Sequence, residues 1–257
     1  MSRGVASIIE LQNVSLGYGR KKVASNLSLQ FYPNEIVSLL GANGCGKTTL
    51  LKTIMGIIPI LGGEISIAGK LQSKWSRKGL AKMVGYVPQA QNNYFPFTSE
   101  AIILMGRTAS LHWAGTPKAE DMEAVTRVMK QLEIEYLAGK LYPQLSGGEK
   151  QLILIARALV QAPKILIMDE PTSSLDYGNQ LRVLEQISRL KQEGMTILMT
   201  THQPEHAVRV ADRLLLFHQG QIIADGASDQ VLTTHNLATI YRLPEEIIRK
   251  NLEGILL

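Results

Sequence analysis

A glycine-rich segment at residues 41–49, GANGCGKTT, has the spacing G-x-x-x-x-G-K-[ST]. Its glycines let successive backbone N–H groups converge on phosphate oxygens, Lys47 can reach the outer phosphates, and the Thr48 hydroxyl can bind Mg²⁺. A glycine-rich turn can also arise without function, but this one follows an apolar run at residues 36–40 and opens a helical pattern, as the motif requires. The segment therefore predicts a site for a nucleoside triphosphate, without specifying the reaction.

Two adjacent carboxylates, Asp169 and Glu170, directly follow the apolar run at residues 165–168. At the end of a buried strand, Asp169 would hold Mg²⁺ and its water shell, and Glu170 is placed to polarise a water for attack on a γ-phosphate. The alternative is a strand that merely ends in two solvated acids. The phosphate-binding segment in the same chain favours the catalytic interpretation.

A third segment, LSGGE at residues 145–149, has the features of an exposed helix N-terminus. Ser146 can cap the helix that follows, and Gly147 and Gly148 leave its first N–H groups accessible, which creates an anion site. Taken alone, the segment would be read as an ordinary capped helix. The phosphate-binding segment and the acidic pair in the same chain favour a functional interpretation of this segment instead.

Strand and helix patterns alternate along most of the chain, which predicts a parallel sheet wrapped by helices with ligands at the carboxyl ends of its strands. Strands are predicted at residues 8–16, 27–31, 36–40, 62–67, 85–87, 165–168 and 196–201, and a hairpin joins 214–217 to 221–223. Helices are predicted at residues 47–55, 151–161 and 181–194, with short ones after 228. Helical signals also replace strand signals between residues 91 and 143, where Thr116 and Pro117 would start a helix.

The composition suits one folded α/β domain. The chain has 257 residues, 45% of them hydrophobic, and a formal charge of +5 that is scattered along the sequence. Scattered charge indicates a solvated surface, so we expect no nucleic-acid partner. The single cysteine excludes an internal disulfide framework and a multi-cysteine metal site. Without a secretion signal or an apolar run approaching ~18 residues, the chain should stay in the cytosol unless a partner holds it at a membrane.

In order and along nearly the whole chain, the motifs resemble those of the ATP-binding subunits of ATP-binding cassette (ABC) transporters. The resemblance extends to Gln89 in YVPQ, to SLD at residues 174–176, to His202 after a strand and to Gln151, while Glu149 is a common variant of a glutamine. It implies an α/β P-loop NTPase with a mostly parallel sheet, an N-terminal antiparallel β subdomain and an inserted helical subdomain. The single domain would span residues 1–257, with residues 1–90 and 150–257 as the core and 91–149 as the helical subdomain with the signature segment.

The resemblance also assigns roles to residues. Glu170, His202 and Gln89 would be catalytic; Thr48, Gln89 and Asp169 would bind Mg²⁺; and Asp176 would contact a second subunit. The nucleotide-binding residues would be Tyr18, Gly41, Asn43, Gly44, Cys45, Gly46, Lys47, Thr48 and Thr49. The signature residues Ser146, Gly147, Gly148 and Glu149 would contact an ATP bound to the other subunit, so the enzyme would be a homodimer with two shared sites.

One cassette without a membrane span resembles bacterial importers whose permease subunits are separate chains and whose substrate is delivered by a periplasmic or lipid-anchored binding protein. The protein would then lie on the cytoplasmic face of the inner membrane. Residues 103–107, ILMGR, and 116–118, TPK, are similar to ATPases that import iron–siderophore complexes, haem, cobalamin or molybdate. At residues 99–102, SEAI departs from the acidic residue and valine usual there, which leaves the chelate open.

Three other functional classes are alternatives to an importer ATPase. A cassette ATPase of iron–sulfur cluster assembly would share every nucleotide motif but bind soluble scaffold proteins. A chromosome-organising or DNA-repair ATPase needs a long coiled coil, and residues 47–169 contain no heptad run. A binding module without hydrolysis would lack Glu170.

A separate expectation concerns Cys45, whose place at a helix N-terminus beside Lys47 should favour the thiolate.

Overall fold

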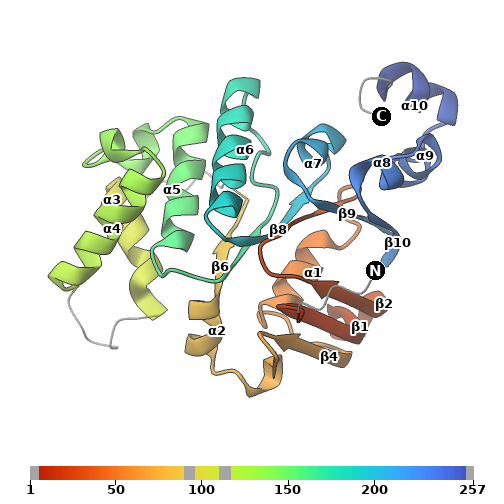
Figure 1. Ribbon diagram of the computed structural model, residues 1–257, viewed down its shortest axis with the longest axis horizontal. Helices are drawn as coiled ribbons and strands as arrows, with labels where there is room; N and C mark the ends of the chain where they lie inside the picture. The colour runs from red at the N-terminus through yellow and green to blue at the C-terminus, as the bar shows by residue number, and fades with distance from the viewer. Residues whose placement is uncertain (1–5, 90–95, 110–116, 253–257) are drawn as a thin grey trace.

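The computed structural model describes residues 6–89, 96–109 and 117–252 (Figure 1). Its strands are β1 (Ile9–Tyr18), β2 (Lys21–Phe31), β3 (Ile36–Leu40), β4 (Gly62–Ile67), β5 (Lys70–Leu71), β6 (Val84–Val87), β7 (Ile165–Met168), β8 (Thr196–Thr201), β9 (Arg213–His218) and β10 (Gln221–Gly226). Its α-helices are α1 (Lys47–Ile54), α2 (Arg77–Met83), α3 (Ser99–Met105), α4 (Ala119–Gln131), α5 (Gly147–Leu159), α6 (Tyr177–Gln192), α7 (Pro204–Val210), α8 (Ser228–Val231), α9 (Thr234–Tyr241) and α10 (Glu245–Leu252).

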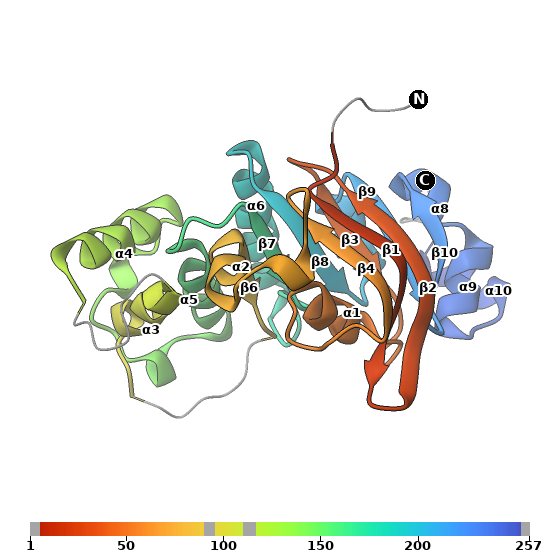
Figure 2. The same cartoon turned by 90° about the horizontal axis from the view of Figure 1, so that it is seen from below.

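The described strands form two sheets. The N-terminal sheet has the order β2-β1-β4-β5 and is antiparallel. The larger sheet has the order β10-β9-β3-β8-β7-β6, and all its neighbouring strands are parallel except the β9–β10 hairpin. Figure 2 shows α1 against the N-terminal sheet, next to the strands of the larger one. The predicted combination of a mostly parallel sheet with an antiparallel N-terminal sheet is confirmed.

Strand β7 illustrates why the parallel strands are continuous apolar runs. Ile165 and Ile167 point into an apolar cluster that contains Leu50 of α1, while Leu166 and Met168 belong to the cluster on the opposite face. Successive side chains of a strand alternate between faces, so a strand covered on both faces must be apolar at every position. The site motifs therefore start from strands with little freedom to move.

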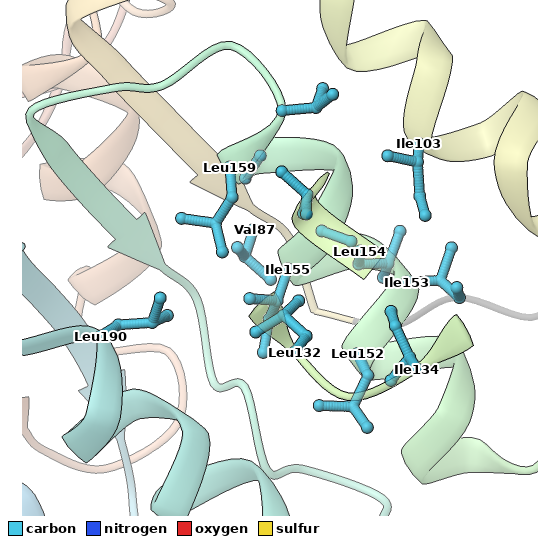
Figure 3. Close-up of a cluster of buried hydrophobic side chains, with 14 of the residues drawn as sticks. Val87, Ile103, Leu132, Ile134, Leu152, Ile153, Leu154, Ile155, Leu159 and Leu190 are labelled. Atoms are coloured by element: carbon cyan, nitrogen blue, oxygen red, sulfur yellow. The ribbon is translucent and has the colours of Figure 1, made fainter. Parts of the chain in front are cut away.

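Helix α5 connects the helical part of the chain to the sheet (Figure 3). Its residues Ile153 and Ile155 are fully buried in one cluster with Val87 of β6, Leu132 beyond α4, and Leu190 of α6. α5 begins at Gly147, four residues before the predicted start, because Ser146 caps it. The helical character predicted for residues 91–143 is confirmed for the described part by α3 and α4.

The predicted start of a helix at Thr116 and Pro117 is wrong in its position. Thr116 lies outside the described residues, and α4 begins at Ala119. The carboxylate of Asp121 accepts a hydrogen bond from the backbone N–H of Lys118 at 3.0 Å, so an acid in the first turn caps the helix from within. Helix α2, which is capped by Ser76, was not predicted.

The C-terminal helices cover the outer side of the larger sheet. Leu237 and Ile240 of α9 are buried in a cluster with Leu214 and Leu216 of β9 and Ala207 of α7. In Figure 1 these helices lie at the opposite end of the molecule from α3 and α4. None of the described helices is long and apolar enough to cross a bilayer.

Candidate active site

The glycine-rich segment lies between β3 and α1, as the motif requires. Gly46 is the N-cap of α1 with φ 111°, and a Cβ there would lie 2.5 Å from Cγ1 of Val23, so only glycine fits. No side chain caps α1, and its first turn contains no acidic residue. The first N–H groups of α1 therefore remain available to an anion, which the positive end of the helix dipole also favours.

Lys47 is held in the loop by its own backbone. Its buried ammonium donates hydrogen bonds to the carbonyl oxygens of Gly41 at 2.8 Å and Ala42 at 3.2 Å. The third proton of an ammonium group is then left for a further partner. That partner is Glu170, whose Oε1 lies 3.4 Å from Nζ as an ion pair longer than a good hydrogen bond. A phosphate oxygen can compete for this position.

Asp169 and Glu170 follow β7 directly, and a side chain of the neighbouring strand β8 fixes both. The hydroxyl of Thr200 donates to Oδ1 of Asp169 at 2.8 Å and accepts the backbone N–H of Glu170 at 2.9 Å. Asp169 is 6% exposed. Glu170 adopts φ 47°, a left-handed conformation that non-glycine residues rarely take and that is enriched at functional sites. At Glu170 the backbone therefore leaves the extended conformation of β7.

His202 joins this cluster from the end of β8. Its Nδ1 lies 3.2 Å from Oε2 of Glu170, and its side chain is 36% exposed, so it faces both the acid and solvent. Lys47 after β3, Glu170 after β7 and His202 after β8 therefore meet at the carboxyl edge of three adjacent parallel strands. Strand order, rather than sequence proximity, brings these residues together.

The residues near the cluster fit a magnesium ion bound chiefly through phosphates and water. The described residues include no group of three or more His, Cys, Asp or Glu side chains that could form an all-protein metal cage. Mg²⁺ in nucleotide sites is bound by one or two carboxylates of the protein together with phosphate oxygens and waters. Asp169 offers a carboxylate oxygen beyond the one that Thr200 occupies, and Thr48 offers a hydroxyl in the first turn of α1.

The signature segment forms the predicted capped helix N-terminus. The Ser146 hydroxyl accepts from the N–H of Glu149 at 3.3 Å, and the Glu149 carboxylate accepts from the N–H of Ser146 at 2.7 Å. These bonds form a capping box and lower the pKa of Glu149, chiefly through the Ser146 N–H. Among the described residues, neither side chain has a hydrogen bond or ion pair with the glycine-rich loop or the acids after β7.

Asp176 lies next to the signature segment. It is the N-cap of α6 and accepts from the backbone N–H of Asn179 at 2.9 Å, which lowers the pKa of its carboxyl. The side chain of Asn179 packs so closely on Gly148 that a Cβ there would lie 2.3 Å from Oδ1. The N-termini of α5 and α6 thus form one surface, on which Tyr177 is 73% exposed.

Tyr18 and Gln89 are exposed, and within the described part of the chain neither side chain forms a hydrogen bond or ion pair with Lys47, Glu170 or His202. Tyr18 ends β1 at the tip of the β1–β2 hairpin, and Val23 of the same hairpin packs on Gly46, so the hairpin lies beside the glycine-rich loop. Gln89 follows β6 by two residues at the same edge of the sheet as the acids after β7. A cavity of about 550 Å³ borders residues 42–45 and the C-terminal end of α9.

The expectation of a favoured thiolate at Cys45 is wrong. Burial raises the pKa of the Cys45 thiol, and this effect outweighs the nearby Lys47 ammonium and the backbone N–H of Lys47, which both lower it. The sequence shows the position at the helix N-terminus but does not show the degree of burial. Cys45 is a partly buried thiol in the loop rather than a reactive one.

Sequence reasoning missed three residues around the cluster. Thr200 is a fully buried polar residue within β8, and the available signal was a threonine directly after the apolar run at residues 197–199, at the end of a predicted strand. His206 of α7 is buried with its Nδ1 2.9 Å from the Thr172 hydroxyl, and burial lowers its pKa. Tyr241 donates a hydrogen bond to the carbonyl oxygen of His202, a contact that no local pattern indicates.

Comparison with known proteins identifies the family. The model of the family described as ABC transporter matches residues 24–173, which is more than half of the chain. The chain belongs to the ABC transporter family. As an ATP-binding subunit, it is 44% identical to an uncharacterized ABC transporter ATP-binding protein of Haemophilus influenzae, over 98% of this chain and 96% of the relative.

Two further relatives of this ABC subunit carry more specific descriptions. The hemin import ATP-binding protein HmuV of Plesiomonas shigelloides is 36% identical, over 93% of this chain and 96% of its own length. A solved metal-chelate type ABC transporter in an inward-facing conformation superposes with a TM-score of 0.82 at 33% identity, covering 93% of this chain and 90% of that one. The resemblance stated from the sequence is thereby confirmed, as is the P-loop NTPase fold.

Proposed function

We propose that the protein hydrolyses ATP at two sites shared between two copies of the chain, and that this reaction powers import of a metal chelate through separate permease subunits. The observation that carries the proposal is the meeting of Lys47, Glu170 and His202 at one edge of the sheet, with separations of 3.4 Å and 3.2 Å. These three residues supply groups suited to ATP hydrolysis. Lys47 is a cation for the phosphate, Glu170 is a carboxylate for the attacking water, and His202 is an imidazole that can orient the carboxylate and the phosphate.

Each group has a role in the proposed reaction. The N–H groups of residues 43–49 hold the phosphates, and Lys47 exchanges Glu170 for a γ-phosphate oxygen. Glu170 then orients the attacking water and accepts its proton, while His202 contacts the γ-phosphate and holds the Glu170 carboxylate. Bound Mg²⁺ would neutralise phosphate charge, with the Thr48 hydroxyl, the Asp169 carboxylate and Gln89 as its protein ligands.

The remaining predicted residues bind the nucleotide or the second subunit. The exposed ring of Tyr18 stacks on adenine, as an aromatic face suits a base. Ser146, Gly147, Gly148 and Glu149 present a helix N-terminus to the γ-phosphate held by the partner, and Asp176 joins the two subunits. Within the described residues, the polar partners of Ser146 and Glu149 lie outside the glycine-rich loop of the same chain, which supports this division between subunits.

A groove of about 630 Å³ supports a membrane-spanning permease as the partner. It is bordered by Ile57, Trp75 and Arg77, and by Val84 and Tyr86 of β6. Ile57 is 60% exposed although it is apolar. Since Gln89 follows β6 by two residues, a permease segment seated in this groove would act on the strand that positions Gln89 at the nucleotide. This arrangement would place the protein on the cytoplasmic face of the inner membrane.

The substrate class is proposed from the relatives. The hemin importer and the metal-chelate transporter structure cover almost all of this chain, and two Helicobacter pylori relatives are described as probable iron chelatin transport proteins. We therefore propose iron–siderophore complexes or haem as the first substrates to test, followed by cobalamin and molybdate. A periplasmic or lipid-anchored protein would deliver the chelate to the permease.

The test is reconstitution of the chain in lipid vesicles with the permease subunits of a metal-chelate importer, and measurement of chelate uptake driven by ATP. Glu170→Gln is the matched control, because it removes the proposed proton acceptor without changing side-chain size. We expect uptake of one chelate with the unaltered chain and none with this variant. Uptake that continues at the same rate with Glu170→Gln, or a chain that binds no permease, would contradict the proposal.

Docking in the groove has its own test. Ile57→Asp should abolish co-purification with the permease and leave ATP binding intact, because it puts a charge on the exposed apolar rim. Ile223→Asp is the control, since Ile223 is an exposed apolar residue on β10 that does not border the groove. Equal loss in both variants would exclude the groove as a specific docking site.

A further inference from the structure

The hydroxyl of Tyr241, the last residue of α9, donates a hydrogen bond of 2.7 Å to the carbonyl oxygen of His202. We propose that Tyr241 is a positioning residue for ATP hydrolysis, because it fixes the backbone from which His202 reaches Glu170. The inference rests on the proposed function, in which His202 and Glu170 act together. It gives the C-terminal helices a part in the reaction, although they lie outside the motifs that bind nucleotide.

His202 lies in the short connection between β8 and α7. β8 ends at Thr201 and α7 begins at Pro204, so two residues connect them. The Thr201 hydroxyl accepts the N–H of Gln203 at 3.0 Å, which shapes the turn but does not contact His202. Since Nδ1 of His202 lies 3.2 Å from Glu170, a shift of about 1 Å would exceed hydrogen-bond distance.

Tyr241 can provide this support because α9 is firmly attached to the sheet. Leu237 is fully buried and Ile240 almost fully, both against β9, and β9 pairs with β3, the strand that leads into the glycine-rich loop. Arg242 ends the helix in a left-handed conformation, with its N–H bonded to the carbonyl of Ala238. The backbone that carries the Tyr241 ring is therefore held in a fixed position relative to the carboxyl edge of the sheet.

The chemistry of the contact is one-directional. A carbonyl oxygen only accepts hydrogen bonds, so the Tyr241 hydroxyl must donate. Burial, together with the charge of Glu205, raises the pKa of Tyr241 well above its usual value. The hydroxyl consequently keeps its proton throughout the physiological pH range, so the hydrogen bond to His202 does not depend on pH in that range.

The same end of α9 also faces the glycine-rich loop. Ile240, Tyr241 and Arg242 border one side of the 550 Å³ cavity, and residues 42–45 border another. Removal of the hydroxyl alone leaves the ring in place beside this cavity. The variant that tests the inference is therefore Tyr241→Phe, which deletes the hydrogen bond to His202 and retains the packing.

In the purified full-length chain, we expect Tyr241→Phe to lower kcat for ATP by about 3- to 10-fold, the effect of one net hydrogen bond, with KM unchanged. The control is Thr239→Val on the same helix, whose hydroxyl bonds to the His235 carbonyl of α9 itself at 2.9 Å. It should leave kcat unchanged. Circular dichroism melting fixes a temperature at which every variant is folded.

A double-mutant cycle with His202→Ala distinguishes positioning from a general structural role. If Tyr241 acts through His202, adding Tyr241→Phe to His202→Ala should cause no further loss, whereas a structural effect would be equally large in both backgrounds. Normal kcat in Tyr241→Phe, with low activity in His202→Ala, would overturn this inference and leave the proposed function intact. Normal activity in His202→Ala would overturn both the inference and the proposed role of His202.

Discussion

The hydroxyl of Thr200 lies 2.8 Å from Oδ1 of Asp169 and donates its proton to it. The same oxygen atom of Thr200 accepts the N–H of Glu170. One buried side chain of β8 thus orients the proposed magnesium ligand and the backbone of the proposed proton acceptor. This relation couples two adjacent parallel strands at the point where the chemistry would occur.

Replacement of Thr200 should affect both stability and activity. Thr200→Val keeps the shape but leaves a buried carboxylate oxygen and a backbone N–H unpaired, so we expect a loss of about 1–3 kcal/mol in the free energy of unfolding. ATP hydrolysis should also fall. Thr200→Ser retains the hydroxyl and should preserve most of the activity. Denaturant unfolding and ATPase rates measure both effects, and a fully stable, active valine variant would contradict the argument.

Glu170→Gln should retain ATP binding and lower the hydrolysis rate by about 10²- to 10⁴-fold, the usual contribution of a general base. Because the nucleotide would persist, ATP and Mg²⁺ should hold the chain as a dimer. Size-exclusion chromatography with and without ATP reports the dimer, and phosphate release reports the rate. Hydrolysis near the normal rate would remove Glu170 from its proposed role.

Sites shared between subunits predict a specific pattern of complementation. One chain carries Lys47→Ala and the other Ser146→Arg, both in a Glu170→Gln background that suppresses hydrolysis. Each homodimer has two damaged sites. The mixed dimer collects both lesions in one site and leaves the other intact, so it should retain one ATP after rapid gel filtration.

If each chain used its own signature segment, every site in the mixture would remain damaged. The mixture would then retain no more ATP than the two homodimers. A wild-type Ser146 chain with the same Glu170→Gln change sets the level expected for two intact sites. The comparison therefore tests the assembly separately from the chemistry.

Cys45 should react slowly with alkylating reagents at neutral pH. Burial raises the pKa of its thiol, so the reactive thiolate is scarce at neutral pH, and its fraction should increase about tenfold per pH unit at pH values well below that raised pKa. Iodoacetamide labelling followed by mass spectrometry gives the rate, and bound ATP should slow it further. A rate that levels off below pH 8 would indicate a lowered pKa instead.

Gly148 and Gly147 provide a matched pair. A Cβ at position 148 would meet the Asn179 side chain at 2.3 Å, whereas one at position 147 would meet only the end of the Leu175 side chain, at 3.1 Å. We expect Gly148→Ala to displace Asn179 and impair ATP-dependent dimerisation, and Gly147→Ala to have a smaller effect. Gly148→Ala combined with Asn179→Ala should recover part of the loss, and an absent rescue would point to another cause.

The sequence predicted the elements that carry chemistry because each motif lies between a buried strand and a helix. Strands β3 and β7 have the predicted bounds, because a glycine or a charged residue lies directly before and after each apolar run. Helix α2 escaped prediction because RKGLAKM contains a single buried residue, Leu80, and offers no periodic pattern.

The contacts between strands were less predictable. Thr200 meets Asp169 across 31 positions of the chain, and Tyr241 meets His202 across 39, so neither pair has a local signature. The pKa of Cys45 depends on burial, and Cys45 packs against an apolar cluster that includes residues as distant in the sequence as Ile9 and Phe217. These long-range contacts and this burial depend on the order of the strands and on how the helices pack against the sheet. They cannot be read from local sequence patterns.

Helix α5 behaves mechanically as a stiff rod. Its 13 residues span about 20 Å, with the signature serine at one end and buried apolar residues from Leu152 to Leu159. Close-packed interiors deform little, so a tilt imposed on the buried end must be carried to the exposed end. A rotation of about 10° would displace Ser146 by about 3.5 Å, more than the length of a hydrogen bond. Small movements inside one subunit would thereby be amplified at the exposed tip of α5, where we propose that the ATP of the second subunit binds.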